Sequence, residues 1–290
     1  MVLPALLLVL PLLPAGAAGA DETPALAAVD SAWSRRAEGA RGGSATEGAA
    51  DAVVAAGRSA VAADPKSLAA RWRLMRALYF KGEHATTGNE EKKAVFDEGK
   101  RLGEETLDLV RREAGPATGK DLSKATPVEL VPFVGGRPDV TACFLWSGVN
   151  WGKWALAYGK TAAARQGAAA KIRDLATAVV RLDPSFEEGG GYRVLGRLHH
   201  QTPAIPFITG WASRSEALAN LRLAARLAPK NFVNRLYLAE AMWDYEKEKR
   251  PEAKKVLEAL VADAPTAGFP VEDARAQEDA RALLAAWARE

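Results

Sequence analysis

The sequence predicts an all-α protein, built as a right-handed solenoid of helix pairs with inserted loops. Alanine, leucine, glutamate and arginine dominate the 290 residues, and β-branched residues rarely alternate with polar ones, so strands with a period of two are hard to find. In addition, small and apolar residues recur at one fixed spacing that ends in proline, and the segments before them share a second pattern. Helical repeats explain both recurrences.

Four segments carry the proline-ended spacing. In each, a small or apolar residue is followed after four positions by a second, after three more by a third, and after five more by proline. This is the pattern of the second helix of a tetratricopeptide-like pair, and the proline ends the helix because it has no backbone N–H to donate. The copies are Val53, Gly57, Ala60 and Pro65; Ile172, Ala176, Val179 and Pro184; Ala217, Leu221, Ala224 and Pro229; and Ala253, Leu257, Leu260 and Pro265.

The first helix of each pair has its own pattern, in which a small residue marks the closest approach of two helices. Pro184 and Pro229 are 45 residues apart, against a repeat of about 34, so loops are inserted, most clearly at 199–211 with Ile205, Phe207 and Ile208. About five pairs are expected, with a long helix at 89–115 and a closing helix at 272–290. The first-helix residues are Trp72, Met75 and Tyr79; Tyr192, Leu195, Gly196 and His199; and Leu238, Ala239 and Met242.

The chain is expected to divide into a signal peptide at 1–20 and a single helical-repeat domain at 21–290. The first segment is a short apolar run that ends in Ala18, Gly19 and Ala20, which is typical of an export signal with a small-residue cleavage site. No lipid-attachment cysteine stands at that site. A soluble periplasmic protein is therefore predicted. Cys143 is the only cysteine, so no intrachain disulfide forms, and its apolar context favours a buried thiol.

Composition argues against several classes of function. Lys and Arg number 39 against 36 Asp and Glu, with the signs interspersed, so no nucleic-acid partner is expected. His84, His199 and His200 have no third ligand at a suitable spacing, and no catalytic constellation is found, so neither a metal, a cofactor nor an enzyme is predicted. The glycines at 189–191 follow no strand, and they are expected to form a bend before a helix that begins near Tyr192 rather than a phosphate loop.

The segment 145–160 is both aromatic and rich in glycine. On a helix, its small residues fall on one stripe and most of its aromatic residues on the next. Gly152 is expected to touch a neighbouring helix closely. The aromatic residues have two interpretations. In the first they belong to the core. In the second some of them line the concave face and form the wall of a groove, so at least one of Trp151 and Trp154 reaches that face. The small stripe is Gly148, Gly152, Ala155 and Gly159, and the aromatic stripe is Ser147, Trp151, Trp154 and Tyr158.

The chain resembles the TatT family, the T component associated with TRAP transporters. The resemblance spans about 50–265 and depends on the segments SGVNWGKWA, NEEKKAVFDEGKRLGEETL, GGGYRVLGRLHH and NRLYLAEAMW. It implies a periplasmic helical-repeat protein that self-associates and works beside a substrate-binding TRAP component. Trp151, Gly152, Lys153, Trp154 and 189–197 match positions of the family motifs.

Two functions remain open. One is a non-enzymatic accessory component of a TRAP-type solute transport system, which binds a partner protein and a small or apolar ligand. The other is a general envelope scaffold that binds peptides on its concave face. Arg193 and Arg197, four residues apart, either grip an anion or form a solvated face. The candidate ligand or partner contacts are Trp146, Asn150, Trp151, Lys153, Trp154, Tyr158, Arg193, Arg197 and His199.

Export can be tested directly. We expect the mature protein to begin near Asp21, because the apolar run ends in small residues that a signal peptidase accepts. Mass analysis of the exported protein measures its first residue. An intact Met1 or a lipid adduct would contradict the prediction.

Overall fold

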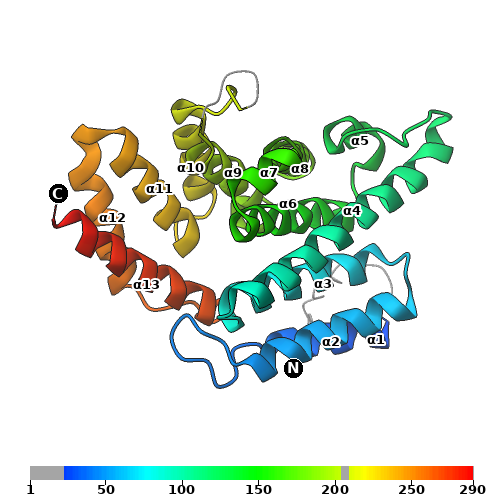
Figure 1. The fold of residues 1–290 in the computed structure, drawn as a ribbon, viewed down its shortest axis with the longest axis horizontal. Helices are drawn as coiled ribbons and strands as arrows, with labels where there is room; N and C mark the ends of the chain where they lie inside the picture. Colours follow the sequence, from blue (N-terminus) through cyan, green and yellow to red (C-terminus); the bar gives the residue numbers. More distant parts are fainter. Residues whose placement is uncertain (1–22, 204–208, 290) are drawn as a thin grey trace, which may run out of the picture.

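The computed structural model describes residues 23–203 and 209–289, and in this part of the chain it contains helices and no strand (Figure 1). The only β-type pairing there is one isolated bridge between Arg41 and Ser44. The all-α prediction is therefore confirmed. The expected signal segment and Ile205, Phe207 and Ile208 of the insertion lie outside the described residues. None of the described helices has the length and apolar character needed to cross a membrane.

The helices follow one another with short connections. They are α1 (Pro24–Ser34), α2 (Glu47–Ala63), α3 (Leu68–Phe80), a π-helical turn η1 (Lys81–Ala85), α4 (Asn89–Thr118), α5 (Pro127–Val134), α6 (Pro138–Tyr158), α7 (Lys160–Arg165), α8 (Ala168–Leu182), α9 (Phe186–Gln201), α10 (Arg214–Leu227), α11 (Phe232–Tyr245), a 3₁₀ turn η2 (Lys247–Lys249), α12 (Arg250–Ala262) and α13 (Pro270–Trp287).

The proline-ended spacing marks helix ends correctly. Pro65, Pro184, Pro229 and Pro265 each lie two or three residues beyond the end of α2, α8, α10 and α12. The small and apolar residues of all four copies are buried, which confirms that this spacing follows the inward face of each helix. The expected long helix is α4, and the closing helix is α13.

Most helices pack on a neighbour along the chain, and α6 also packs on α3 and α4. The pairs α1 and α2, α3 and α4, α6 and α8, α9 and α10, and α11 and α12 are in contact, with α5 and α7 as short insertions and α13 against α11 and α12. The two largest clusters of buried apolar side chains follow this order. One extends from α1 to α8, and the other from α10 to α13.

Glycines allow close helix contacts at the start and middle of α9. A Cβ atom on Gly196 would lie 2.5 Å from Cγ of Leu221 on α10, so only glycine fits there. The predicted bend before α9 exists, but it lies at Glu187, Glu188 and Gly189, which all have a left-handed backbone, and regular helix resumes at Gly190. The first-helix pattern thus identified the close approach of α9 and α10.

The predicted close contact of Gly152 is wrong. A Cβ atom there would meet nothing within 4 Å, one on Gly148 would make an ordinary contact of 3.6 Å with Leu175, and Gly159 ends α6 with a φ of 87°. The close contact between α6 and α4 uses glycines of the partner helix instead. Gly99 and Gly103 of α4 receive the side chains of Asn150 and Ser147, respectively.

Two matched substitutions separate these environments. Gly196→Ala should reduce the free energy of unfolding by about 1–3 kcal/mol, because its methyl group overpacks against Leu221. Gly152→Ala should leave it unchanged or raise it by about 0.5–1 kcal/mol, because alanine favours helix and the site is open. Urea denaturation measures both, and equal effects would contradict the packing of α9.

Candidate functional site

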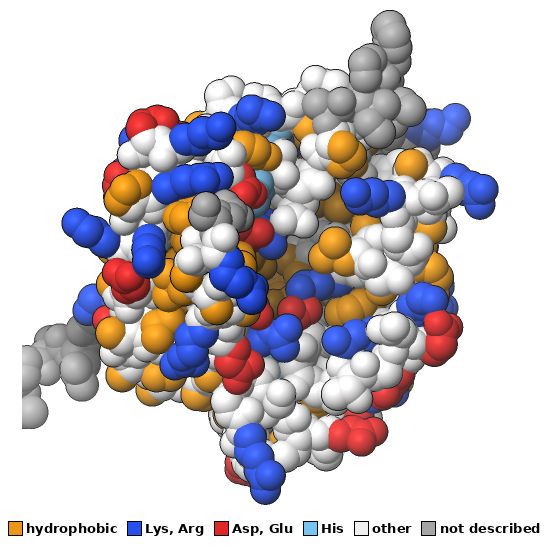
Figure 2. Space-filling model, turned by 60° about the vertical axis from the view of Figure 1, so that its left-hand side comes forward, with side chains coloured by type: hydrophobic (Ala, Val, Ile, Leu, Met, Phe, Trp, Pro, Cys, Tyr) orange, Lys and Arg blue, Asp and Glu red, His pale blue; other side chains and the backbone are white. Residues whose placement is uncertain are grey.

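The centre of the molecule is hollowed, and Figure 2 shows hydrophobic, basic and acidic side chains around this hollow. Tyr79 of α3 lies within electrostatic range of side chains on several distant helices. Its hydroxyl group interacts electrostatically with Glu83, Arg193 of α9, Tyr237 of α11 and Glu272 of α13. Burial raises the pKa of Tyr79 well above its usual value, although the side chain is only half-buried. This combination is expected of a residue deep inside a concave surface that solvent still reaches.

The hollow is closed on one side by a contact between the two ends of the described chain. Nε of Arg36, in the loop after α1, donates to Oε1 of Glu272 at 3.0 Å, and Nη2 donates to the carbonyl oxygen of Gly268. The backbone N–H of Gly43 donates to Oε1 of Glu278 at 2.9 Å. In Figure 1, α13 accordingly runs back to the loop between α1 and α2. The two ends of the described chain therefore meet on this side of the hollow.

Unpaired donors lie beside Tyr79. The rings of Tyr79 and Trp146 are 5.6 Å apart, and the indole Nε1 of Trp146 is buried with no hydrogen-bond partner among the described residues. The same holds for Nε of Arg76, one turn before Tyr79, whereas Nη2 of Arg76 lies 3.8 Å from the Asp30 carboxylate. The Arg76 guanidinium lies 3.9 Å from the ring centre of Trp33 and 4.9 Å from that of Trp72, and burial lowers its pKa to about 10. A ligand with a hydrogen-bond acceptor could pair with one of these two donors.

Lys153 was predicted as a site residue, and it lies in this region. Its Nζ donates to Oε2 of Glu83 at 2.5 Å and is 5.7 Å from the ring centre of Tyr79. Burial alone would raise the pKa of the Glu83 carboxyl, but the charge and hydrogen bond of Lys153 outweigh burial, so that pKa lies below its usual value. The Glu83 carboxyl is therefore ionised at neutral pH.

Arg193 and Arg197 both extend from α9 to α11. Arg193 donates to Oδ1 of Asn234 at 2.9 Å, and Arg197 donates to Oε2 of Glu240 at 2.6 Å. The Arg197 guanidinium also stacks over Tyr237 at 4.2 Å. The solvated face does not describe them, because each guanidinium already has an acceptor from the protein.

Three predicted site residues belong to the core. Trp151 and Trp154 are each 2% exposed, and Asn150 is 0% exposed. Asn150 donates to the carbonyl oxygens of Met75 and Trp146, and Nε1 of Trp154 donates to Asp97. The expectation that Trp151 or Trp154 reaches the concave face is wrong, because α4 and α8 cover that side of α6. The core interpretation of these tryptophans is the one that the structure supports.

Tyr158 and His199 lie elsewhere. Tyr158 is 40% exposed at the end of α6 and stacks on Trp154 at 4.7 Å. His199 accepts a hydrogen bond at Nδ1 from the backbone N–H of Ser213 and meets Trp211 edge-on at 5.2 Å. Burial lowers the pKa of His199, so its neutral form is favoured. Its position is that of a residue that organises the α9–α10 connection.

Several residues around the hollow were not predicted. Arg76, Glu83, Tyr237 and Glu272 carry charge or aromatic surface there. Tyr79 was recognised only as part of a repeat. The sequence signal for Tyr79 was its position on a first helix, since first helices face the concave side of helical repeats. One helix alone, however, does not show which of its residues lie opposite another helix.

The groups that lie near Tyr79 are aromatic and charged. Within residues 23–203 and 209–289, no three His, Cys, Asp or Glu side chains lie together in a way that would hold a metal ion. Burial raises the pKa of the Cys143 thiol far above neutrality, so this sulfur is not a nucleophile. Aromatic walls with a few polar groups suit recognition of an organic molecule.

Comparison of the chain with protein-family models finds no match, and comparison with curated proteins finds none either. The resemblance to the TatT family therefore depends on the four sequence segments alone, and the transport role that it implies is a proposal.

The pair of Lys153 and Glu83 predicts a specific pH dependence. In Lys153→Met the Glu83 carboxyl stays buried without its cation, so its pKa should move from below to above the usual value. A carboxyl group whose pKa is lowered by folding stabilises the protein at pH values above its unfolded-state pKa. This stabilisation is lost as the pH falls through the folded-state pKa. The stability difference between wild type and variant should therefore be largest at neutral pH and shrink in acid.

Denaturant unfolding over a pH series measures this difference. Lys160→Met is the matched control, because Lys160 is exposed and makes no ion pair within the described part of the chain. A pH-independent loss in Lys153→Met would mean that packing and not charge is responsible.

Proposed function

We propose that the chain is a non-enzymatic periplasmic protein of tetratricopeptide-like helix pairs, arranged as a right-handed solenoid, and an accessory component of a TRAP-type transport system. Its central hollow binds a small organic ligand, and its outer surface binds a partner protein. The resemblance to the TatT family supports the transport role. Five packed helix pairs, four of them ended by proline, support the repeat architecture.

One observation carries the ligand proposal: two buried donors without hydrogen-bond partners in the described part of the chain lie close to Tyr79. Nε1 of Trp146 and Nε of Arg76 lack acceptors among the described residues. A buried donor left unpaired costs about 1–3 kcal/mol, and a ligand with an acceptor would remove that cost on binding. Tyr79, Trp146 and Tyr237 add the aromatic surface that such sites commonly have.

The alternative is an envelope scaffold that binds a peptide along its concave face. Peptide grooves of helical repeats are open, and here the contacts of Arg36 with Glu272 and of Gly43 with Glu278 close one side of the concave surface. A small ligand suits this geometry better than an extended chain. We therefore place protein partners on the outer surface.

Native mass spectrometry of the protein purified from the periplasm tests ligand binding. We expect a bound small molecule, and Trp146→Phe should weaken its binding by roughly threefold to tenfold, because phenylalanine keeps the apolar surface and loses one donor. Trp211→Phe is the control, since Trp211 is also half-buried but packs on His199. A protein that retains peptides and no small molecule would favour the scaffold.

Co-expression with the TRAP substrate-binding subunit of the same organism tests the transport role separately. A complex that survives size-exclusion chromatography is the expected result. Ligand binding without any such complex would leave the hollow as a ligand site and refute the TRAP association.

A further inference from the structure

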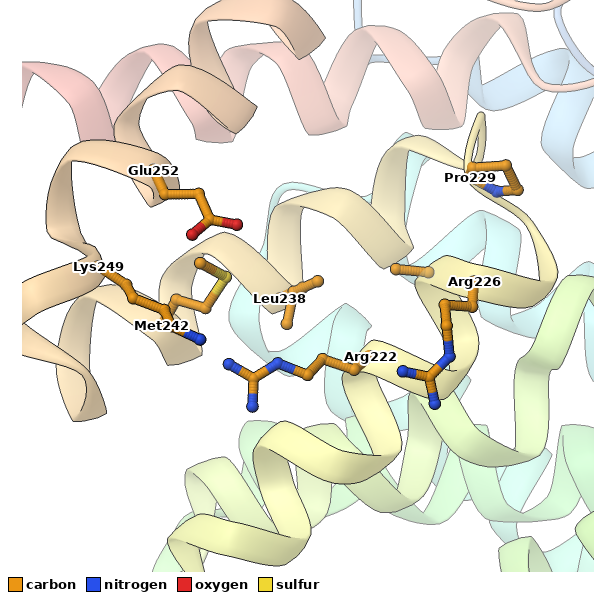
Figure 3. A pocket seen from close by; sticks show the side chains of 8 residues that line it. Arg222, Arg226, Pro229, Leu238, Met242, Lys249 and Glu252 are labelled. Carbon is orange, nitrogen blue, oxygen red and sulfur yellow. The ribbon is translucent and has the colours of Figure 1, made fainter.

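A second concave site lies on the surface between α10 and α12. It has a volume of about 460 Å³. Leu238 and Met242 of α11 form its floor, with Ala225 of α10 and Pro229 of the following turn beside them. Both α10 and α12 pack on α11, and the pocket is the space that remains between them. Figure 3 shows that the charged side chains of Arg222, Arg226, Lys249 and Glu252 surround this floor.

The charges around this outer pocket do not balance. Arg222 contacts Glu246 at 2.5 Å, and Lys249 contacts the same carboxyl group at 3.8 Å, so two cations share one anion. Arg226 is exposed and has no hydrogen bond or ion pair with any other described residue. Together with Glu252, the pocket has three cations against two carboxylates, a surplus of one positive charge.

The floor is apolar and adaptable. Met242 is 3% exposed, and Leu238 is half-buried. Methionine has an unbranched, polarisable side chain, and it is common at surfaces that accept different apolar groups. An occupant of this pocket therefore needs an apolar group for the floor and a negative charge for Arg226.

We infer that the outer pocket docks a partner polypeptide segment that presents an apolar side chain next to a carboxylate. The pocket is open to solvent and not an enclosed cavity, so it suits a side chain carried on a polypeptide better than a small molecule that must be enclosed. Arg226 receives the carboxylate, and Leu238 and Met242 receive the apolar group. This site shares no residue with the hollow and does not depend on the ligand proposed for it.

Fluorescence anisotropy with a fluorescein-labelled peptide of alternating leucine and glutamate tests the inference on the full chain. We expect saturable binding that weakens as salt is added, because the charges are exposed. Peptides with glutamine in place of glutamate, or serine in place of leucine, should bind more weakly. No saturable binding, or equal binding of all three peptides, overturns the inference.

Two substitutions in opposite directions locate the site. Arg226→Glu should weaken binding of the alternating peptide by about fivefold or more, and Glu252→Gln should strengthen it by about twofold to fivefold. Both residues are exposed, and a gain of affinity cannot come from unfolding. Arg181→Glu, an exposed arginine on α8, is the control and should have no effect.

Octanoate, which has a carboxylate and an apolar chain but no backbone, provides the last comparison. Failure of octanoate to displace the peptide supports a polypeptide partner. Octanoate binding that depends on Arg226 and Glu252, without peptide binding, would make the pocket a small-molecule site and overturn the inference. Neither result bears on the ligand of the hollow, because Trp146 and Arg76 are unchanged in all these variants.

Discussion

The contact between α13 and the loop after α1 is the constraint on which the hollow depends. Arg36 and Glu272 are 236 residues apart in sequence, and their side chains are only 6% and 14% exposed. Desolvation makes such a pair a weak source of stability, whereas loss of one partner costs about 3–5 kcal/mol, because the other charge stays buried. The apolar contact of Val271 with Phe80 and Ala50 gives the closure its favourable free energy, and the ion pair makes it specific.

The sequence predicted helices and their ends well because the causes are local. A proline that follows a helical segment favours its end, because it has no backbone N–H to donate, and a regular spacing of apolar residues defines the inward face of a helix without reference to its neighbours. Pro184 and Pro229 illustrate this, since each lies just beyond a helix end. The same reasoning failed for Gly152. A stripe of small residues shows that close approach is allowed, but the α4–α6 contact uses Gly99 and Gly103 instead.

The candidate site was predicted in part, and the division has a physical reason. Trp146 and Lys153 lie at the hollow, whereas Trp151 and Trp154, on the same helix, are covered by other helices. A helical wheel separates these faces but does not show which one a neighbour covers. Tyr79 becomes a site residue only because α9, α11 and α13 come to lie opposite it, and that arrangement depends on contacts between residues far apart in sequence.

The left-handed turn before α9 shows how α11 determines the direction of its neighbour. Glu187 and Glu188 have φ values of 48° and 57°, and this conformation costs a non-glycine residue roughly 1–2 kcal/mol. Asn234, fully buried on α11, donates to the carbonyl oxygen of Glu188 at 2.9 Å, and Arg193 donates to that of Glu187 at 3.3 Å.

These bonds hold the strained turn in place, and they leave Glu187 within electrostatic range of Arg76 on α3. Arg193 therefore acts on the hollow by positioning this turn. Arg193 donates to Asn234, and Arg197 donates to Glu240. The two arginines whose spacing suggested an anion-binding site therefore have acceptors within the protein. Because both acceptors lie on α11, the spacing that suggested a ligand site instead joins α9 to α11.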